Sequence, residues 1–391
     1  MRNIELIMVS ADNNNKFYKM VESADGKEFT ITYGRIGQSG TSETYPINRW
    51  NSKYREKIKK GYKDVTEFKR IVTDSSLIFE HSDLELFYTT FEQYSSNSVK
   101  HNYQISSDSV TPLMIKEAQG ILDFMLDSVN AESLDNFNKG LIDLFTILPR
   151  KIRDVRKELY TSFDNSKLID RISKEQDVLD SLDSQIISSV SSSNNLGKTS
   201  INDLFNCQIE PVTAADRAIL EGIINPTNTS KHKIFKGFKI THNLTQPKFD
   251  KWLSEQSNKS CKYLIHGTRN TSVFSILKSG LVLRPTNAVF SGSIYGKGIY
   301  HSFHADKSLG YTGYDNDKVF FIQNVHMGNH FTYNGWYRDG KGLSSSQMNY
   351  PYLKSQGYDS LYVAPGDGLR NSEYIVYNEE QTTTNFLVWL K

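Results

Sequence analysis

The stretch from Gly292 to Thr312, GSIYGKGIYHSFHADKSLGYT, gathers residue types that can do chemistry. Its glycines around a lysine resemble a phosphate-binding loop, its two histidines a metal site, and its tyrosines the wall of a nucleotide pocket. A Walker-type loop has four residues between its first glycine and Gly-Lys, and a Ser or Thr after the lysine. Here three residues separate Gly292 from Gly296, and Gly298 follows the lysine. We therefore expect no phosphate loop of that type.

The two histidines, His301 and His304, stand without the neighbours that a metal site needs. A structural zinc site takes four ligands from Cys, His and carboxylate side chains at characteristic spacings. The chain has two cysteines, Cys207 and Cys261, and neither lies near the HSFH pair in the sequence. We expect no metal here, which leaves the wall of a pocket open as the third interpretation.

The chain after residue 200 supplies the elements that would position these residues. Segments rich in β-branched and aromatic residues are typical of strands, and they recur as KIFKGFKIT, CKYLIHGT, KVFFIQNVHM, YDSLYVAP, SEYIVYN and TNFLVWLK. FSILKSGL, between them, predicts a short helix that ends at Gly280. Together these segments predict an α+β domain over residues 200–391.

The upstream sequence divides into three regions. The runs KFYKMVES and KEFTITYGRIG predict a small β-rich domain over residues 1–72. Residues 73–108 have a weaker pattern and predict a connector with one strand or short helix. Apolar residues at helical spacing predict an all-α bundle over residues 109–190, and the polar run SSVSSSNNLGKTS predicts a linker after it. The expected fold class is therefore multidomain α+β.

Three separated motifs resemble the catalytic domain of poly(ADP-ribose) polymerases. They are LIHGTR from Leu264, YGKGIY with KSLGY from Tyr295, and NSEYIVY from Asn371, and the resemblance spans about residues 204–391. Upstream, ITYGRIG resembles the Trp-Gly-Arg (WGR) domain of DNA-dependent members, with Tyr33 in place of the family's Trp. The helical run, DLFTILPR in particular, resembles the regulatory helical domain of those members.

The resemblance implies an active site that takes NAD+ as its substrate and needs no metal. The family's His-Tyr-Glu triad corresponds to His266, Tyr300 and Glu373. His266 would bind the adenosine ribose, and Glu373 would stabilise the positive charge that develops at the reacting ribose carbon. The resemblance also implies that Gly267 and Ser308 bind the nicotinamide carboxamide, and that Tyr311 clamps the nicotinamide ring together with Tyr300. Thr268 stands where the family often has Ser, and Arg284 is implied as a weaker adenosine or phosphate contact. Lys307 is left open between a substrate contact and a solvated lysine.

The first domain is the implied DNA-binding site, with Tyr33, Arg35 and Trp50 as expected contacts. Within this domain, the segment NRWNSKYREKIKKGYKDVTEFKR interleaves basic and aromatic residues, which suits a nucleic-acid backbone. A solvated amphipathic helix explains the same charge run and stays open as an alternative. The implied partners are DNA strand breaks and acceptor proteins, including the chain itself, and no membrane.

Composition adds few limits. The formal net charge of +2 over 391 residues indicates no global electrostatic partner, so a basic patch has to be local. Two cysteines are too few for a disulfide framework and favour a reducing setting. We expect an intracellular protein, located in the nucleus of a eukaryotic host and otherwise in the cytoplasm.

The predicted function is a DNA-dependent NAD+ ADP-ribosyltransferase that builds poly(ADP-ribose) on proteins in a DNA-damage response and releases nicotinamide. Two alternatives stay open. One is a mono-ADP-ribosyltransferase or NAD glycohydrolase of the same fold, and the other is a DNA-binding scaffold with an inactive pocket. In the predicted mechanism, DNA at the first domain loosens the helical domain, which otherwise obstructs NAD+.

Overall fold

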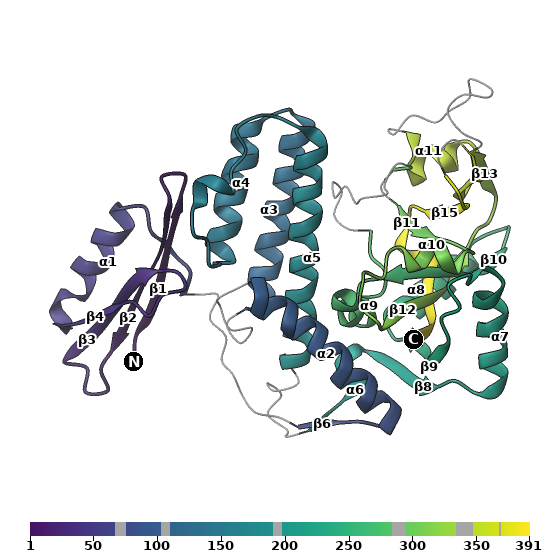
Figure 1. Ribbon diagram of the computed structural model, residues 1–391, viewed down its shortest axis with the longest axis horizontal. Coiled ribbons are helices and arrows are strands. Elements are labelled where there is room, and N and C mark those ends of the chain that lie inside the picture. The colour runs from purple at the N-terminus through teal and green to yellow at the C-terminus, as the bar shows by residue number, and fades with distance from the viewer. Residues whose placement is uncertain are drawn as a thin grey trace. The chain divides into compact units, whose positions relative to one another are not determined.

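The structure is a computed structural model of the chain and describes residues 1–66, 76–102, 110–190, 198–283, 295–296, 298–333, 347–366 and 369–391. These residues form two compact units. Unit 1 comprises Met1–Val72 and Ser96–Ile186, and unit 2 comprises Thr73–Ser95 and Ile187–Lys391. Both contain helices and strands (Figure 1), which makes the chain a mixed α+β protein with a β-rich N-terminal region.

Unit 1 begins with a sheet in the strand order β4-β3-β2-β1-β5, in which every pairing is antiparallel. Its elements are β1 (Asn3–Ser10), β2 (Asn14–Glu22), β3 (Glu28–Arg35), β4 (Thr41–Pro46), the 3-10 turn Ile47–Arg49, α1 (Trp50–Lys59) and β5 (Lys63–Asp64). Alternate residues of a strand face one side of a sheet. Tyr18, Met20, Phe29 and Ile31 therefore point the same way and share one apolar core with Trp50 of α1.

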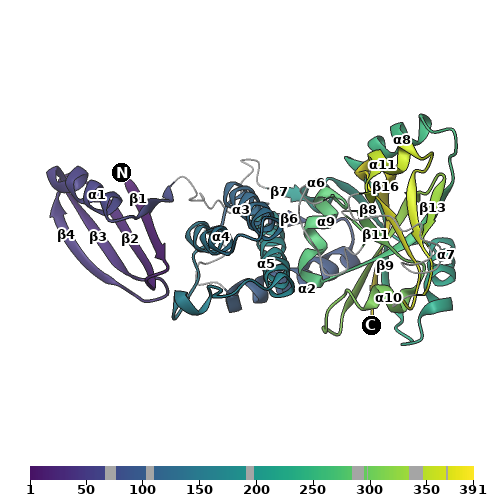
Figure 2. The same ribbon diagram turned by 90° about the horizontal axis from the view of Figure 1, so that it is seen from above.

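The rest of unit 1 is helical. Its main helices are α3 (Pro112–Asn130), α4 (Leu134–Ile147) and α5 (Asn165–Val190, of which the part up to Ile186 belongs to unit 1), and they lie side by side in both views (Figure 1, Figure 2). The Thr111 hydroxyl accepts a hydrogen bond from Met114 N at 3.3 Å and caps α3. α3 and α4 approach closely at Gly140, where a Cβ atom would lie 2.3 Å from Cγ of Met125. Because these helices share a unit with the sheet, a separate helical domain is not shown.

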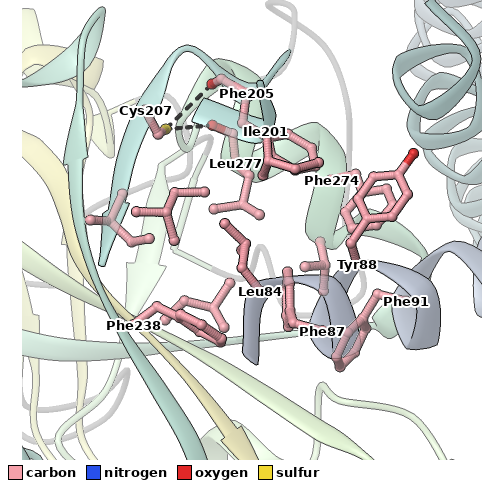
Figure 3. Close-up of a cluster of buried hydrophobic side chains, with 14 of the residues drawn as sticks. Leu84, Phe87, Tyr88, Phe91, Ile201, Phe205, Cys207, Phe238, Phe274 and Leu277 are labelled. Atoms are coloured by element: carbon pink, nitrogen blue, oxygen red, sulfur yellow. Dashed lines mark hydrogen bonds between the residues drawn. The ribbon is translucent and has the colours of Figure 1, made fainter. Parts of the chain in front are cut away.

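The expected connector over residues 73–108 differs from what the structure places there. β6 (Ser76–Ile78) pairs in parallel with β7 (Lys198–Ser200), and the long helix α2 (Ser82–Asn102) follows β6. Leu84, Phe87, Tyr88 and Phe91 of α2 are buried in the core of unit 2, where Phe87 packs on Phe238 (Figure 3). Their i, i+3, i+4, i+7 spacing is that of an amphipathic helix. The described part of this region thus supplies core residues to unit 2.

Unit 2 is built on two sheets, with the strand orders β10-β12-β16-β9-β8 and β11-β15-β14-β13. The strands are β8 (Cys207–Pro211), β9 (Ile234–His242), β10 (Cys261–Thr268), β11 (Ile299–His301), β12 (Lys318–His326), β13 (His330–Tyr333), β14 (Ser360–Val363), β15 (Glu373–Val376) and β16 (Thr382–Leu390). An isolated bridge between Ile265 and Ser302 joins the sheets. β12 is central in the first sheet, and its residues Phe320, Phe321 and Ile322 are fully buried, because both faces of the strand are covered.

The helices of unit 2 that follow α2 are α6 (Ile201–Phe205), α7 (Ala214–Ile224), α8 (Thr245–Ser254), α9 (Val273–Ser279), α10 (Ala305–Leu309) and α11 (Tyr350–Ser355). α9 ends at Gly280, whose φ of +75° favours glycine, as the FSILKSGL segment predicts. Near it, the Cys207 thiol donates to the carbonyl oxygens of Phe205 and Leu277 (Figure 3). Among the described helices we find none with the length and apolar character that crossing a membrane requires.

Candidate active site

His266 lies on β10, beside β11. Its Nδ1 atom is 3.0 Å from the carbonyl oxygen of Tyr300. A carbonyl only accepts hydrogen bonds, so Nδ1 carries the proton and Nε2 of the neutral ring is left as an acceptor. Burial lowers the pKa of His266, and the Tyr300 carbonyl only partly opposes this. The ring is therefore neutral at physiological pH and can accept a hydrogen bond from a hydroxyl group.

Tyr300 is the central residue of β11 and pairs with Ile375 of β15. Its hydroxyl donates to Gly296 O at 2.8 Å and accepts from Tyr295 N at 3.0 Å, which holds the ring in one orientation. Burial raises its pKa, and the nearby negative charge of Glu373 adds to this. Tyr300 is thus a fixed, neutral aromatic wall.

Glu373 begins β15, where it pairs with Val363 of β14, and only 4% of its surface is exposed. One carboxylate oxygen, Oε1, forms an ion pair with Lys307 Nζ at 2.7 Å. Lys307 also donates to Asn371 O at 3.1 Å. No other described residue hydrogen-bonds to Glu373, so its second oxygen, Oε2, has no hydrogen-bond partner in the described part of the chain. The site therefore holds a buried, oriented carboxylate with one oxygen available.

Lys307 is the residue whose place the sequence left undecided. It lies on α10, and its side chain is 12% exposed. Burial lowers its pKa, while the hydrogen bond and charge of Glu373 act in the opposite direction. The one sequence signal for this role is its place in the KSLGY motif, between the two predicted ring-clamp tyrosines; nothing local points to Glu373.

Gly267 and Ser308 lie in direct contact in the structure. A Cβ atom added at Gly267 would lie 2.0 Å from Ser308 O, so only glycine lets β10 and α10 approach this closely. Ser308 is 2% exposed. Thr268, the last residue of β10, is buried and pairs with Val319 of β12.

Tyr311 follows α10 and keeps 46% of its surface exposed. Burial raises its pKa, and so does the charge of Glu373. The same carboxylate acts on Tyr300 in the same direction. Tyr300, Tyr311 and Glu373 therefore lie within electrostatic range of one another.

His301 is 2% exposed, and neither of its ring nitrogens has a hydrogen-bond partner. Burial lowers its pKa to about 3, so the ring is neutral. Its centroid lies 6.2 Å from that of His266. His304 precedes α10. Within the described ranges, no group of three or more His, Cys, Asp or Glu side chains is arranged to hold a metal ion.

Two expected features lie outside the described residues. Arg284, the weaker adenosine or phosphate contact, is one of them. The other is the segment from Tyr337 to Met348, which by the resemblance stands where the family's acceptor-side loop lies, and which is described only from residue 347. Both stay predictions from the sequence.

The expected DNA contact Trp50 is a core residue of unit 1. It is 3% exposed, its ring packs edge-on against Phe29 at 5.0 Å between centroids, and the Arg2 guanidinium lies 4.6 Å from its ring centroid. A side chain covered in this way cannot reach a DNA backbone. We therefore do not retain Trp50 as a DNA contact.

Arg35 is engaged within unit 1. Its guanidinium donates to Asn13 and to the carbonyl oxygens of Ile152 at 3.0 Å and Arg153 at 2.9 Å. Two distant segments of unit 1 are thereby tied together, and these bonds compete with any phosphate contact.

Tyr33 is half-buried on β3 and lies beside a group of cations and aromatic rings. Its hydroxyl donates to Glu43 Oε1 at 2.7 Å. Lys57 Nζ lies 5.9 Å from the Tyr33 ring centroid and 4.5 Å from that of Tyr18. Of the three expected DNA contacts, Tyr33 is the one that the structure leaves partly exposed next to lysine.

Comparison with known families gives two matches in this chain. The poly(ADP-ribose) polymerase catalytic domain matches residues 217–391, and the WGR domain matches residues 3–69. The first match contains His266, Tyr300, Lys307 and Glu373.

Individual proteins agree with these family matches. The chain is 44% identical over 158 residues to the putative poly [ADP-ribose] polymerase-like 100L of Invertebrate iridescent virus 6. The aligned region covers 40% of this chain and 86% of that protein. The chain is 33% identical over 230 residues to uncharacterized protein 101L of the same virus, which covers 58% of this chain and 96% of that protein. Poly [ADP-ribose] polymerase 2 of Arabidopsis thaliana is 26% identical over 216 residues, covering 48% of this chain and 33% of that protein.

The chain belongs to the poly(ADP-ribose) polymerase family. It carries that family's catalytic domain together with a WGR domain, as the motifs in its sequence predicted. It is an NAD+ ADP-ribosyltransferase, and NAD+ is the substrate of its catalytic domain.

Proposed function

We propose that this transferase depends on DNA and builds poly(ADP-ribose) on acceptor proteins, including itself, in a DNA-damage response. The observation that carries the proposal is the carboxylate of Glu373, which is buried, paired through Oε1 with Lys307 at 2.7 Å, and without a hydrogen-bond partner at Oε2 among the residues that the structure describes. A carboxylate with one oxygen anchored and the other open can bind a hydroxyl group in a defined position.

In the proposed reaction, Glu373 accepts a hydrogen bond from the ribose 2′-hydroxyl of NAD+. The bond between ribose C1′ and the nicotinamide nitrogen breaks, and its electron pair leaves with nicotinamide, which becomes neutral. The positive charge that develops at C1′ and the ring oxygen is stabilised by the carboxylate. The oxygen of the acceptor hydroxyl or carboxylate then bonds to C1′, and a hydroxyl acceptor gives up its proton to Glu373.

The other pocket residues bind and orient the substrate in this proposal. His266 Nε2 accepts a hydrogen bond from the adenosine ribose, because Nδ1 is committed to the Tyr300 carbonyl. The rings of Tyr300 and Tyr311 enclose the cationic nicotinamide ring, whose charge is attracted by aromatic faces. The Gly267 backbone and the Ser308 hydroxyl hold the carboxamide, Thr268 supports them at the end of β10, and Arg284 adds a phosphate or adenosine contact.

The first domain is the proposed sensor of DNA strand breaks. Its WGR match and the lysines that lie over tyrosine rings support this role: Lys53 is 4.1 Å from the Tyr45 centroid and Lys57 is 4.5 Å from that of Tyr18. Ammonium groups held on one surface can pair with phosphates, while an aromatic ring such as Tyr33 can stack on an exposed base. In a eukaryotic host such a function belongs in the nucleus.

A single assay separates the proposed activity from its alternatives. The purified protein is incubated with labelled NAD+, with and without nicked DNA, and the products are separated on a gel. A ladder or smear that appears with DNA supports DNA-dependent polymer formation. A sharp protein band indicates transfer of a single unit, free ADP-ribose indicates NAD+ hydrolysis, and equal activity without DNA contradicts DNA dependence.

The regulatory part of the proposal concerns residues 109–190, which would restrain NAD+ access until DNA binds. Deleting them should raise the turnover of NAD+ without DNA, because the restrained state can no longer form. The deletion variant is compared with the full chain by circular dichroism and by turnover of NAD+ without DNA. A folded variant whose basal turnover is unchanged or lost contradicts the regulatory proposal and leaves the assignment of Glu373 untouched.

A further inference from the structure

Asp317 is a meeting point of three distant segments of unit 2. Its carboxylate accepts a hydrogen bond from the Tyr94 hydroxyl of α2, with 2.6 Å between Oη and Oδ2. It accepts a second from Trp389 Nε1 of β16, with 2.8 Å to Oδ1. The Asp317 side chain is 14% exposed, so both bonds are largely shielded from water. Bonds from neutral donors to a carboxylate in such a place are stronger than ordinary surface hydrogen bonds.

The backbone of the same residue hydrogen-bonds to the segment that follows His266. Asp317 O accepts a hydrogen bond from Asn270 Nδ2 at 3.0 Å, and Asp315 Oδ2 accepts from the same amide at 3.2 Å. Asn270 is 1% exposed and comes four residues after His266 in the chain. Asp315 and Asp317 end the loop that begins after α10 and contains Tyr311. These bonds connect the segment after His266 to the loop of Tyr311.

The pocket walls are therefore held together at two places. One is the contact of Gly267 with Ser308, where the backbones leave no room for a Cβ atom. The other is the Asn270 amide between Asp315 and Asp317. The Gly267–Ser308 contact is between backbones, so only a large backbone shift can change it. The Asn270 contact uses the side chains of Asn270 and Asp315 and the backbone carbonyl of Asp317.

α2 is placed so that its position can affect the Asn270 contact through Asp317. Phe87 and Phe91 anchor it in the core of unit 2 (Figure 3), and the Tyr94 ring lies 5.8 Å from that of Phe91. The helix runs to Asn102, whereas unit 2 includes it only up to Ser95. Tyr94 thus stands at the point where the helix leaves unit 2, and its hydroxyl bonds to the residue that orients the pocket loop.

We propose that Asp317 is a positioning residue for NAD+ binding, and that the Tyr94–Asp317 hydrogen bond makes the geometry of the pocket depend on the position of α2. The proposal rests on the proposed roles of His266 and Tyr311 in holding NAD+. It assigns no chemical step to Asp317, which acts by holding the two pocket walls at their spacing. A displacement of α2 is expected to weaken NAD+ binding before it affects the chemical step, because Glu373 and Lys307 lie on other elements.

The test compares two variants of α2 in the full chain. Tyr94→Phe removes the bond to Asp317 and keeps the ring. Asp83→Asn is the matched control, because Asp83 also joins α2 to unit 2, through an ion pair with Lys236 of β9 at 2.7 Å. Loss of one charge-assisted bond that acts through a neighbouring loop should raise KM for NAD+ about threefold to tenfold in Tyr94→Phe. The kcat of both variants and the KM of Asp83→Asn should stay near the wild-type values.

A second pair of variants tests Asp317 itself. Asp317→Asn keeps an oxygen that can accept from Trp389 and an amide that can donate to the Tyr94 oxygen. KM for NAD+ should therefore rise in Asp317→Ala and stay close to the wild-type value in Asp317→Asn. Melting temperatures are measured for all four variants. An unchanged KM in Tyr94→Phe, an equal rise in Asp83→Asn, or an Asp317→Ala variant that changes only in melting temperature would each overturn the proposal. A fully active Glu373→Gln variant would instead contradict the proposed function.

Discussion

Glu175 in unit 1 and Glu373 in unit 2 are both buried carboxylates, with 5% and 4% of their surfaces exposed. Their partners differ. Glu175 Oε1 accepts from Arg150 at 3.0 Å and Arg171 at 2.9 Å, and Oε2 accepts from Arg150 at 2.7 Å. Among the described residues, Glu373 pairs only through Oε1 with Lys307. Both oxygens of Glu175 are thus hydrogen-bonded by arginines, whereas one oxygen of Glu373 has no partner within the described part of the chain.

The difference separates a structural charge from a functional one. Burial alone would raise the pKa of Glu175, but the guanidinium groups of Arg150 and Arg171 outweigh it and lower the pKa. Both arginines also lie over the Phe145 ring, so the cluster forms one packed unit. A buried charge with all its bonds made can stabilise a fold but has no capacity left to bind a substrate. Incomplete pairing is what points to Glu373 as the reacting group.

The largest expected effect is on catalysis, in Glu373→Gln. The variant keeps the shape of the side chain and loses the negative charge that would stabilise the transition state. We expect kcat to fall by about 10²–10³-fold, the usual cost of losing one such contact. Steady-state release of nicotinamide measures this. A variant with near wild-type kcat would place the chemistry elsewhere.

The next effect should be on stability, in Glu175→Gln. The substitution removes the negative charge that Arg150 and Arg171 share, while Arg171 keeps its ion pair with Glu158, so the free energy of unfolding should fall by about 3 kcal/mol. Turnover of NAD+ should stay at or above the wild-type level, because Glu175 belongs to unit 1 and the candidate active site to unit 2. Urea unfolding together with turnover measures both. A loss of turnover in the folded variant would remove the distinction between the two carboxylates.

A smaller effect is expected from Lys307→Met, which keeps the length of the side chain and removes the ion pair. Glu373 then loses the contact that orients it, and kcat should fall by about tenfold while KM for NAD+ changes little. Lys354→Met is a suitable control, because Lys354 forms a similar ion pair with Asp359 in the same unit at 2.7 Å. Equal effects in the two variants would show that the Lys307 pair is only structural.

The smallest effect concerns pH, and it separates the two units by the pH at which each loses stability, since the pKa values of His301 and Glu175 are both lowered. Burial lowers the pKa of His301 from 6.5 to about 3, so the unfolded chain binds a proton that the folded chain does not. Unit 2 should therefore lose stability as pH falls below about 6.5. The pKa of Glu175 is also lowered, so its contribution to unit 1 is complete above about pH 4.3 and is lost only as pH falls further.

Melting curves between about pH 8 and about pH 4 test this order of the two units. His301→Phe removes the ionisable ring and should flatten the pH dependence of unit 2 between about pH 6.5 and about pH 5. It leaves Glu175 untouched and so serves as the control for unit 1. A first transition in unit 1 on acidification would contradict the expected order.

Much of unit 2 could be predicted from the sequence, because its strands are marked locally. The segment CKYLIHGT coincides with β10 and KVFFIQNVHM covers β12, since β-branched and aromatic runs bounded by turns carry the strand signal. The candidate triad was predicted by resemblance. The structure then brings His266 beside Tyr300, and pairs Tyr300 with the strand that Glu373 begins.

Other features could not be predicted because they depend on partners far away in the chain. The sequence predicted a connector with one strand or short helix where α2 carries Leu84, Phe87, Tyr88 and Phe91, and their burial in unit 2 depends on residues more than a hundred positions later. Trp50 sits among basic residues in the sequence, yet Phe29 and Arg2 cover it. The charge pattern around Trp50 predicts that this segment lies at the surface, but packing decides which of its aromatic rings is exposed.

The sequence by itself determined the family, the strands that carry the site, and the residue types of the candidate triad, because each is written in a short run of neighbouring residues. Only the tertiary structure decided that Lys307 orients Glu373, that Arg35 binds backbone within unit 1, and that Asp317 joins α2 to the pocket loop. The physical reason is that hydrogen bonds and ion pairs act over a few ångströms. Their partners therefore depend on how distant segments pack.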